Sequence, residues 1–89
     1  MSNHLNDHSY YNIIINDMDK HANNEFNGNA RLLSVNIDLE ILDYSFNQKL
    51  AEVKTSVEKK SKDTLFLKST LLESGKAIAQ ASSLWSKEI

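Results

Sequence analysis

Apolar residues in the first third of the chain recur three and four positions apart, which is the spacing of one face of an α-helix. The stripe consists of Tyr11, Ile14, Ile15, Met18 and Ala22, with Phe26 continuing it just past the end. Asp7 or Ser9 is suited to capping its start, because a short polar side chain accepts a bond from a free backbone N–H of the first turn. The β-branched run 13–15 also fits a short strand, but the longer stripe favours one short helix.

A cluster of asparagine and glycine follows, with residues 23–29 reading Asn-Asn-Glu-Phe-Asn-Gly-Asn. Such residues favour turns, because Asn bonds its own backbone and Gly accepts left-handed geometry. We predict a break here. It divides a single domain into an Asn-rich segment, 1–29, with one short helix, and a longer segment, 30–89.

The segment 30–89 contains no proline and one glycine, Gly75, which is typical of long helices. Its first apolar stripe at helical spacing is Leu32, Val35, Leu39, Leu42, Phe46, Leu50, Val53 and Val57. Its second is Leu67, Leu71, Gly75, Ile78 and Trp85. The polar stretch 59–64 between them is the turn of an α-helical hairpin, capped by Ser61 or Asp63, or an exposed turn of one long broken helix.

These stripes predict an all-α fold with coiled-coil-like packing, in which the two stripes form the interface with the same or another helical protein. A glycine inside a helix costs about 1 kcal/mol relative to alanine, so Gly75 is expected to have a packing reason. Trp85, close to the C-terminus, is suited either to anchoring a partner or to filling the chain's own core.

One stretch also has the pattern of a strand. Leu33, Val35, Ile37, Leu39 and Ile41 alternate with polar residues, as in an amphipathic strand. The helical interpretation is preferred because its stripe continues through Val57, whereas the alternation stops at Leu42, and a lone strand without a partner is unstable. The alternative is an α+β domain that has 33–41 as an edge strand and dimerises across it.

Length and composition favour a partner protein on physical grounds. A folded chain of 89 residues buries only about 60–65% of its unfolded surface, which gives marginal stability without further support. The chain has no cysteine, which excludes disulfides and thiolate sites. Self-association or a second protein is therefore the expected source of additional burial, in a homo- or hetero-oligomer.

Charge is divided along the sequence. Residues 1–48 carry seven acidic and two basic side chains, and residues 49–89 carry five acidic and eight basic ones. The overall net charge of −2 does not suggest nucleic acid as a partner, since phosphate contacts need a basic surplus. The lysines at 54, 59, 60 and 62 are interpreted as a solvated face, because no aromatic residues lie among them.

Motifs for catalysis are not found. The chain has no nucleophile elbow, no phosphate-binding glycine loop and no His-Glu-x-x-His, so we expect no enzyme activity, no cofactor and no metal site. No apolar run approaches the roughly 20 residues that span a bilayer. The start Met1-Ser2-Asn3-His4 does not resemble a secretory signal, so a cytoplasmic location is expected.

The general build resembles the small all-helical subunits, chaperones and filament-forming components of bacterial secretion systems. That resemblance rests on size, the lack of proline and cysteine, and the helical stripes, and it assigns no residue a role. We therefore expect a small helical interaction module, acting as an oligomeric structural subunit or as a chaperone or adaptor. The alternative is an acidic-faced regulatory or inhibitor protein that binds an enzyme, toxin or transcription factor through Asp38, Glu40 and Asp43.

Overall fold

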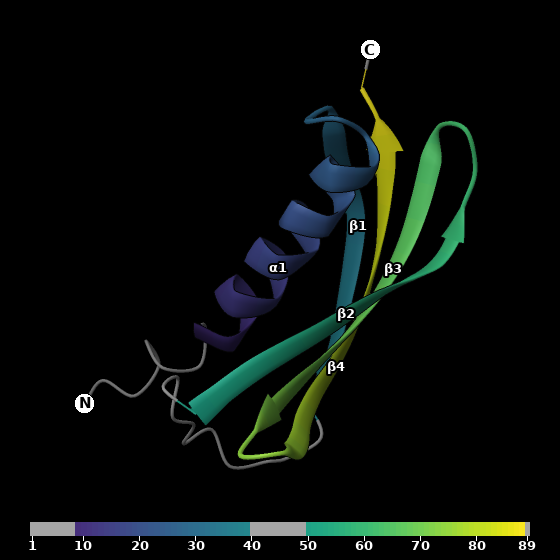
Figure 1. Ribbon diagram of the computed structural model, residues 1–89. Helices are drawn as coiled ribbons and strands as arrows, with labels where there is room; N and C mark the ends of the chain where they lie inside the picture. Colours follow the sequence, from purple (N-terminus) through teal and green to yellow (C-terminus); the bar gives the residue numbers. More distant parts are fainter. Residues whose placement is uncertain (1–8, 40–49, 89) are drawn as a thin grey trace.

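The computed structural model describes residues 9–39 and 50–88, which form one helix and four strands (Figure 1). In chain order these are α1 (Ser9–Glu25), β1 (Ala30–Leu39), β2 (Ala51–Lys60), β3 (Thr64–Glu73) and β4 (Lys76–Lys87). The strands form one antiparallel sheet in the order β1-β4-β3-β2. β1 and β2 are therefore the two edge strands.

The predicted all-α fold is wrong, because the described part of the chain after α1 consists of strands and turns. The α-helical hairpin, the long broken helix and the coiled-coil packing are corrected with it. Of the two possibilities left open for 59–64, a turn and a continuous helix, the structure has a turn, which joins β2 to β3 rather than two helices. Its ends are tied where the Ser61 N–H donates to the Thr64 carbonyl at 2.8 Å.

The N-terminal helix is confirmed. Ile14, Met18 and Ala22 of its apolar stripe are completely buried, as one face of a surface helix requires. The helix ends at the predicted break, where the Gly28 N–H donates to the Asn23 carbonyl at 2.8 Å and Asn27 takes a left-handed φ of 55°. This bond across five residues, next to a left-handed residue, is the Schellman arrangement that ends many helices.

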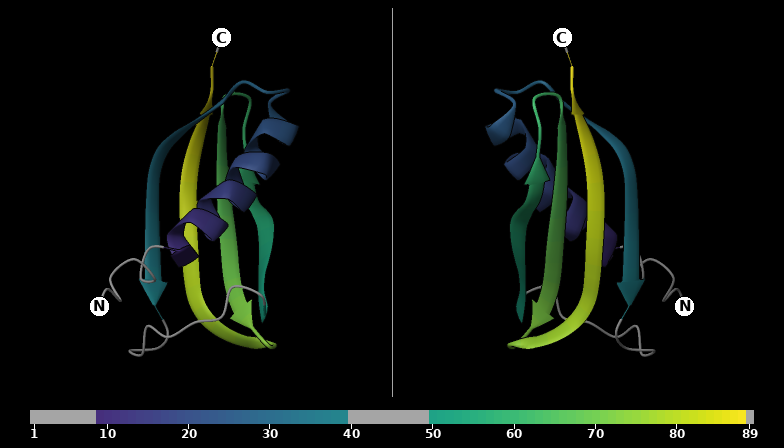
Figure 2. Two further views of the ribbon diagram at one scale, coloured as in Figure 1. Left: turned by 90° about the vertical axis from the view of Figure 1, so that its left-hand side faces the viewer. Right: turned by 90° about the vertical axis from the view of Figure 1, so that its right-hand side faces the viewer.

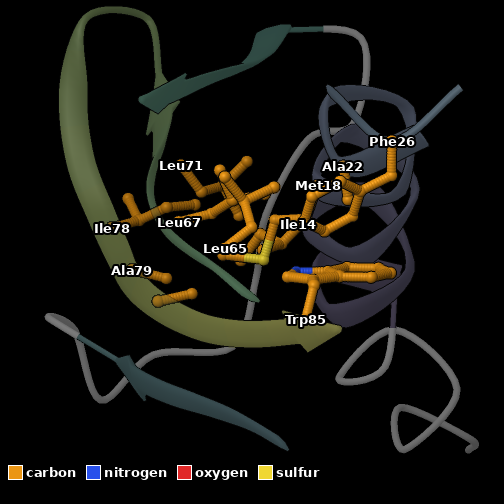
Figure 3. Close-up of a cluster of buried hydrophobic side chains, with 11 residues drawn as sticks. Ile14, Met18, Ala22, Phe26, Leu65, Leu67, Leu71, Ile78, Ala79 and Trp85 are labelled. Atoms are coloured by element: carbon orange, nitrogen blue, oxygen red, sulfur yellow. The ribbon is translucent and has the colours of Figure 1, made fainter. Parts of the chain in front are cut away.

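The two central strands supply most of the sheet's share of the core. In β3, Leu65, Leu67 and Leu71 alternate with exposed or half-buried residues, and their burial follows that alternation. In an antiparallel pair, opposed residues lie on the same face, so Trp85, Ser83 and Ala79 of β4 continue the buried face beside them. Figure 3 shows Leu65 and Trp85 of this face lying close to Met18 and Ile14 of α1.

The turn between β3 and β4 explains Gly75, which lies outside any helix. Ser74 and Gly75 form a two-residue turn with φ values of 52° and 83°. Two positive φ values are the geometry of a type I′ hairpin, for which glycine is favoured. No neighbouring atom lies within 4 Å of the place that a Cβ on Gly75 would occupy. The predicted packing reason is therefore wrong, and the backbone conformation explains this glycine.

Within the residues that the structure describes, one face of the sheet is covered and the other is bare. α1 crosses the sheet diagonally on one side, and from the opposite side no described element lies in front of the strands (Figure 2). The helix is fastened to β2 by the Thr55 hydroxyl, which donates to the Asp17 carboxylate at 2.6 Å and lies 2.7 Å from the Ser69 hydroxyl. The described residues thus form a two-layer α+β unit whose sheet has β1 and β2 at its edges.

Candidate interaction surface

The two edge strands differ in how they are protected. An edge strand presents unpaired backbone N–H and C=O groups to any other extended chain, and proteins blunt it with charges, bulges and inward-pointing lysines. β2 carries five charged residues among ten: Glu52, Lys54, Glu58, Lys59 and Lys60. It also has a bulge between Val57 and Lys59. β2 therefore has the features of an edge that resists pairing.

Lys60 links the β2 edge to the end of α1. Its ammonium donates to the Glu25 carboxylate at 2.8 Å and lies 5.9 Å from the centre of the Phe26 ring. The side chain thus turns to the helix side of the sheet, away from the face of Lys59, whose strand partner is Phe66. The lysines of 54–62 accordingly do not form one patch, and the basic surplus is distributed over both faces of the β2 edge.

β1 has little such protection. Its ten residues carry two charges, Arg31 and Asp38, one near each end. A bulge lies between Leu32 and Ser34, and the register is regular from Ser34 to Leu39. Within this regular stretch the inner, helix-side positions are Val35, Ile37 and Leu39. No described strand pairs with the outer edge of this stretch, and its inner side is apolar.

Large apolar side chains are exposed at this edge. Leu33 keeps 49% and Leu39 keeps 37% of its surface accessible, while Val35 and Ile37 are half-buried. The strand interpretation of the sequence had identified these residues through their alternation, so that signal was sufficient to find them. The preferred helical stripe omitted Leu33, Ile37 and the exposed Asn36 between Val35 and Ile37.

The helix extends the apolar surface next to β1. Asp17 bonds Thr55 of β2, so the flank of α1 that carries Asp17 faces β2. At 3.6 residues per turn, Ile15 lies almost on the opposite flank, with Tyr11 one turn before it. Ile15 packs against the core, and Tyr11 is exposed. By this geometry the two side chains lie on the flank of α1 that faces away from β2, towards β1.

The structure separates the residues predicted as one interface. Four of them, Leu67, Leu71, Ile78 and Trp85, are buried in the chain's own core. Those at or next to the sheet edges are Leu32, Val35 and Leu39 in β1, Val53 and Val57 in β2, and the exposed Leu50 directly before β2. Gly75 lies in the β3–β4 turn, and Leu42 and Phe46 fall outside the described residues. Contact with another protein through these residues stays a prediction.

Polar side chains between α1 and β2 form the other notable cluster. An open hollow of about 360 Å³ is lined by Ile13, Asn16, Asp17, Lys20 and Val53. His21 Nδ1 lies 3.5 Å from the Asp17 carboxylate, which also accepts from Thr55. The Asp17 carboxylate therefore lies between the Thr55 hydroxyl and the His21 imidazole. The imidazole is not placed to take the hydroxyl proton, as a base that activates a nucleophile must be. The cluster fastens the helix to the sheet.

The described residues contain neither a cluster of metal ligands nor a membrane-spanning helix. Within residues 9–39 and 50–88, His, Asp and Glu side chains do not gather into a group of three that could hold a metal ion. In the same residues no helix has the length and apolar character needed to cross a membrane.

Comparison with known proteins gives no relative. No protein-family model matches the chain, and no curated protein or solved structure is significantly similar to it. The class is therefore defined by the fold and its edges alone: a small two-layer α+β protein with one charged edge and one open apolar edge.

Proposed function

We propose that this chain is a non-enzymatic protein-interaction module, which binds an extended segment of another polypeptide along β1. The observation that carries the proposal is the contrast between the two edges. β1 has a regular, weakly charged stretch from Ser34 to Leu39, whereas β2 carries five charges. The proposal keeps the structural subunit or adaptor role and the cytoplasmic location expected from the sequence, but replaces helix pairing by strand addition.

Strand addition explains both the polar and the apolar character of this edge. Backbone hydrogen bonds to the free edge supply affinity, and alternate side chains supply specificity. A bound strand would cover Val35, Ile37 and Leu39 on the inner side, where an alternating partner could place apolar side chains beside them. It would also shield Tyr11 and Ile15 of α1.

A matched pair of lysine substitutions tests the proposal. The probe is a displayed library of short random peptides selected against the folded protein, with binding mapped by amide chemical shifts. Selected peptides are expected to be extended and alternating, and to perturb β1. Val35→Lys should remove binding because it places an inward-pointing charge on the edge. Val57→Lys, at an inner position of β2, should leave binding unchanged. Peptides that map to β2 or to the hollow beside α1 would contradict the proposal.

A second candidate function is regulation of a basic partner. Asp38 is exposed at the β1 edge, next to the exposed Leu39, and its carboxylate lies 3.4 Å from the Asn36 side-chain amide. An acidic group beside an exposed apolar one suits the inhibitor role; Glu40 and Asp43 lie outside the described residues. Asp38→Asn should then slow association with basic selected peptides and reduce its salt dependence, while Glu52→Gln on β2 should not.

A further inference from the structure

We infer that the strand paired with β1 is β1 of a second copy of this chain, running antiparallel about a twofold axis. The inference rests on the proposed function and names its partner. It depends on three features of β1: its register with β4, the sequence of side chains along its free edge, and the exposed apolar surface beside it.

The register with β4 restricts how two copies can pair. From Ser34 onward, even-numbered residues point to the bare face and Val35, Ile37 and Leu39 point to the helix face. Residues opposed in an antiparallel pair share a face, and their free N–H and C=O groups must point towards each other. Both conditions hold when the twofold axis passes beside Asn36 or beside Ile37.

Side chains fit in both registers. With the axis beside Asn36, Val35 meets Ile37 of the other copy on the helix face, and Asp38 meets Ser34 on the bare face. With the axis beside Ile37, the inner pairs are Val35 with Leu39, and Asp38 meets Asn36. Asp38 therefore faces an uncharged hydrogen-bond donor in either case, and like charges, which are destabilising when directly opposed, do not meet.

The axis one residue further along does not fit. It would place two Asp38 carboxylates directly opposite each other. Before Ser34, the bulge at Leu33 reverses the alternation and interrupts the regular register, so the pairing ends there. The edge thus has a short self-complementary stretch with its one carboxylate placed off the axis.

A second copy also supplies burial that the monomer lacks. The core is a single layer between α1 and one face of the sheet, and its β1 side keeps Leu39 and Tyr11 exposed. Twofold pairing brings the same surface of both molecules together. The apolar side chains beside β1 of one copy are then covered by the apolar side chains beside β1 of the other. A chain of this length gains most from such added burial.

Cysteine cross-linking tests the pairing and its register. The chain has no cysteine, so a single introduced thiol reports only its own position. Directly opposed residues have Cα atoms about 4.5–5.5 Å apart, within the disulfide range of about 4.4–6.8 Å, whereas diagonal neighbours at about 7–8 Å are too far. Asn36→Cys should cross-link if the axis lies beside Asn36, and Ile37→Cys if it lies beside Ile37. Ser56→Cys, on β2, should stay unlinked.

Oligomeric state in solution provides the second readout. Sedimentation of the wild type and of Val57→Lys should give a dimer that dissociates on dilution. Val35→Lys should weaken the dimer at least about tenfold, because its ammonium faces Ile37 or Leu39 of the other copy. If Val35→Lys does not fold, Asn36→Asp replaces it: this exposed change opposes carboxylates in both registers and should weaken the dimer severalfold, while Ser56→Asp on β2 should not.

Three results would overturn the inference: a wild type that is monomeric at all concentrations, a dimer sensitive to Val57→Lys but not to Val35→Lys, or cross-linking through Ser56→Cys alone. A monomer that still selects extended peptides along β1 overturns only the second copy as partner. A monomer that selects none overturns the proposed function as well.

Discussion

At the scale of single residues, the buried polar groups each have a partner that fixes their place. Trp85 is 2% exposed and Ser83 is 1% exposed, yet the Trp85 indole N–H donates to the Ser83 hydroxyl at 2.7 Å. The two residues lie on the same face of β4, two positions apart. The bond lets a large aromatic side chain enter the core without an unpaired donor.

Removing that hydroxyl should destabilise the fold. Ser83→Ala leaves the buried indole N–H unpaired and is expected to lower the free energy of unfolding by about 1–3 kcal/mol. Trp85 is the chain's one tryptophan, so its fluorescence during urea unfolding gives both stability and environment. Ser82→Ala, on the bare face, is the control and should stay within about 0.5 kcal/mol of the wild type. Equal stability of the two variants would show that the indole bond contributes nothing.

At the scale of elements, the β3–β4 hairpin is the connection most dependent on local backbone geometry. Its two turn residues both have positive φ, and they join the two strands that carry most of the sheet's part of the core. β4 is paired on both sides, with β1 and β3. Stability of the whole sheet is therefore sensitive to this turn.

Two substitutions in this turn should change the stability of the fold in opposite directions. Gly75→Ala forces a Cβ into left-handed geometry and is expected to cost about 1–2 kcal/mol, although no neighbour obstructs the new atom. Ser74→Asn creates the Asn-Gly pair that type I′ turns favour and should stabilise by a few tenths of a kcal/mol. Thermal unfolding measures both. A destabilising Ser74→Asn would mean that the turn is not of this type.

The sequence was sufficient for α1 and for the break after it, because both depend on local signals. The stripe Tyr11, Ile14, Ile15, Met18 and Ala22 mixes spacings of three and four, which fit one face of a helix but not one face of a strand, and Asn27-Gly28 has a strong turn preference. The strands were missed because residues four apart also lie on one face of a strand. Leu67 and Leu71 therefore fit a helix and a strand equally well.

A polar residue on the inner face concealed the alternation in β3. Ser69 stands between Leu67 and Leu71, and its partner is the Thr55 hydroxyl of β2, which the sequence alone does not bring near. The sequence offers 33–41 no strand partner for the same reason, because β4, which pairs with β1, also fits helical spacing. Non-local pairing decided the fold, and local periodicity could not supply it.

At the scale of the whole molecule, one helix covers one face of a four-stranded sheet, and the added burial proposed at β1 should appear in the thermal melt. The melting midpoint should rise with protein concentration for the wild type and for Val57→Lys, because only folded chains form the dimer. It should depend less on concentration for Val35→Lys, because that dimer is weaker. Far-ultraviolet circular dichroism follows the transition, and a concentration-independent wild type would contradict self-association.

The charged edge of β2 limits how many copies of the chain can join one sheet. A protein with two open edges can add copies without end and form fibres, whereas a twofold contact uses the same surface of both molecules. Pairing through β1 leaves a β2 at each outer end of the enlarged sheet, with Lys54, Glu58 and Lys59 exposed there. Assembly through this contact is therefore finite, and it stops at two chains.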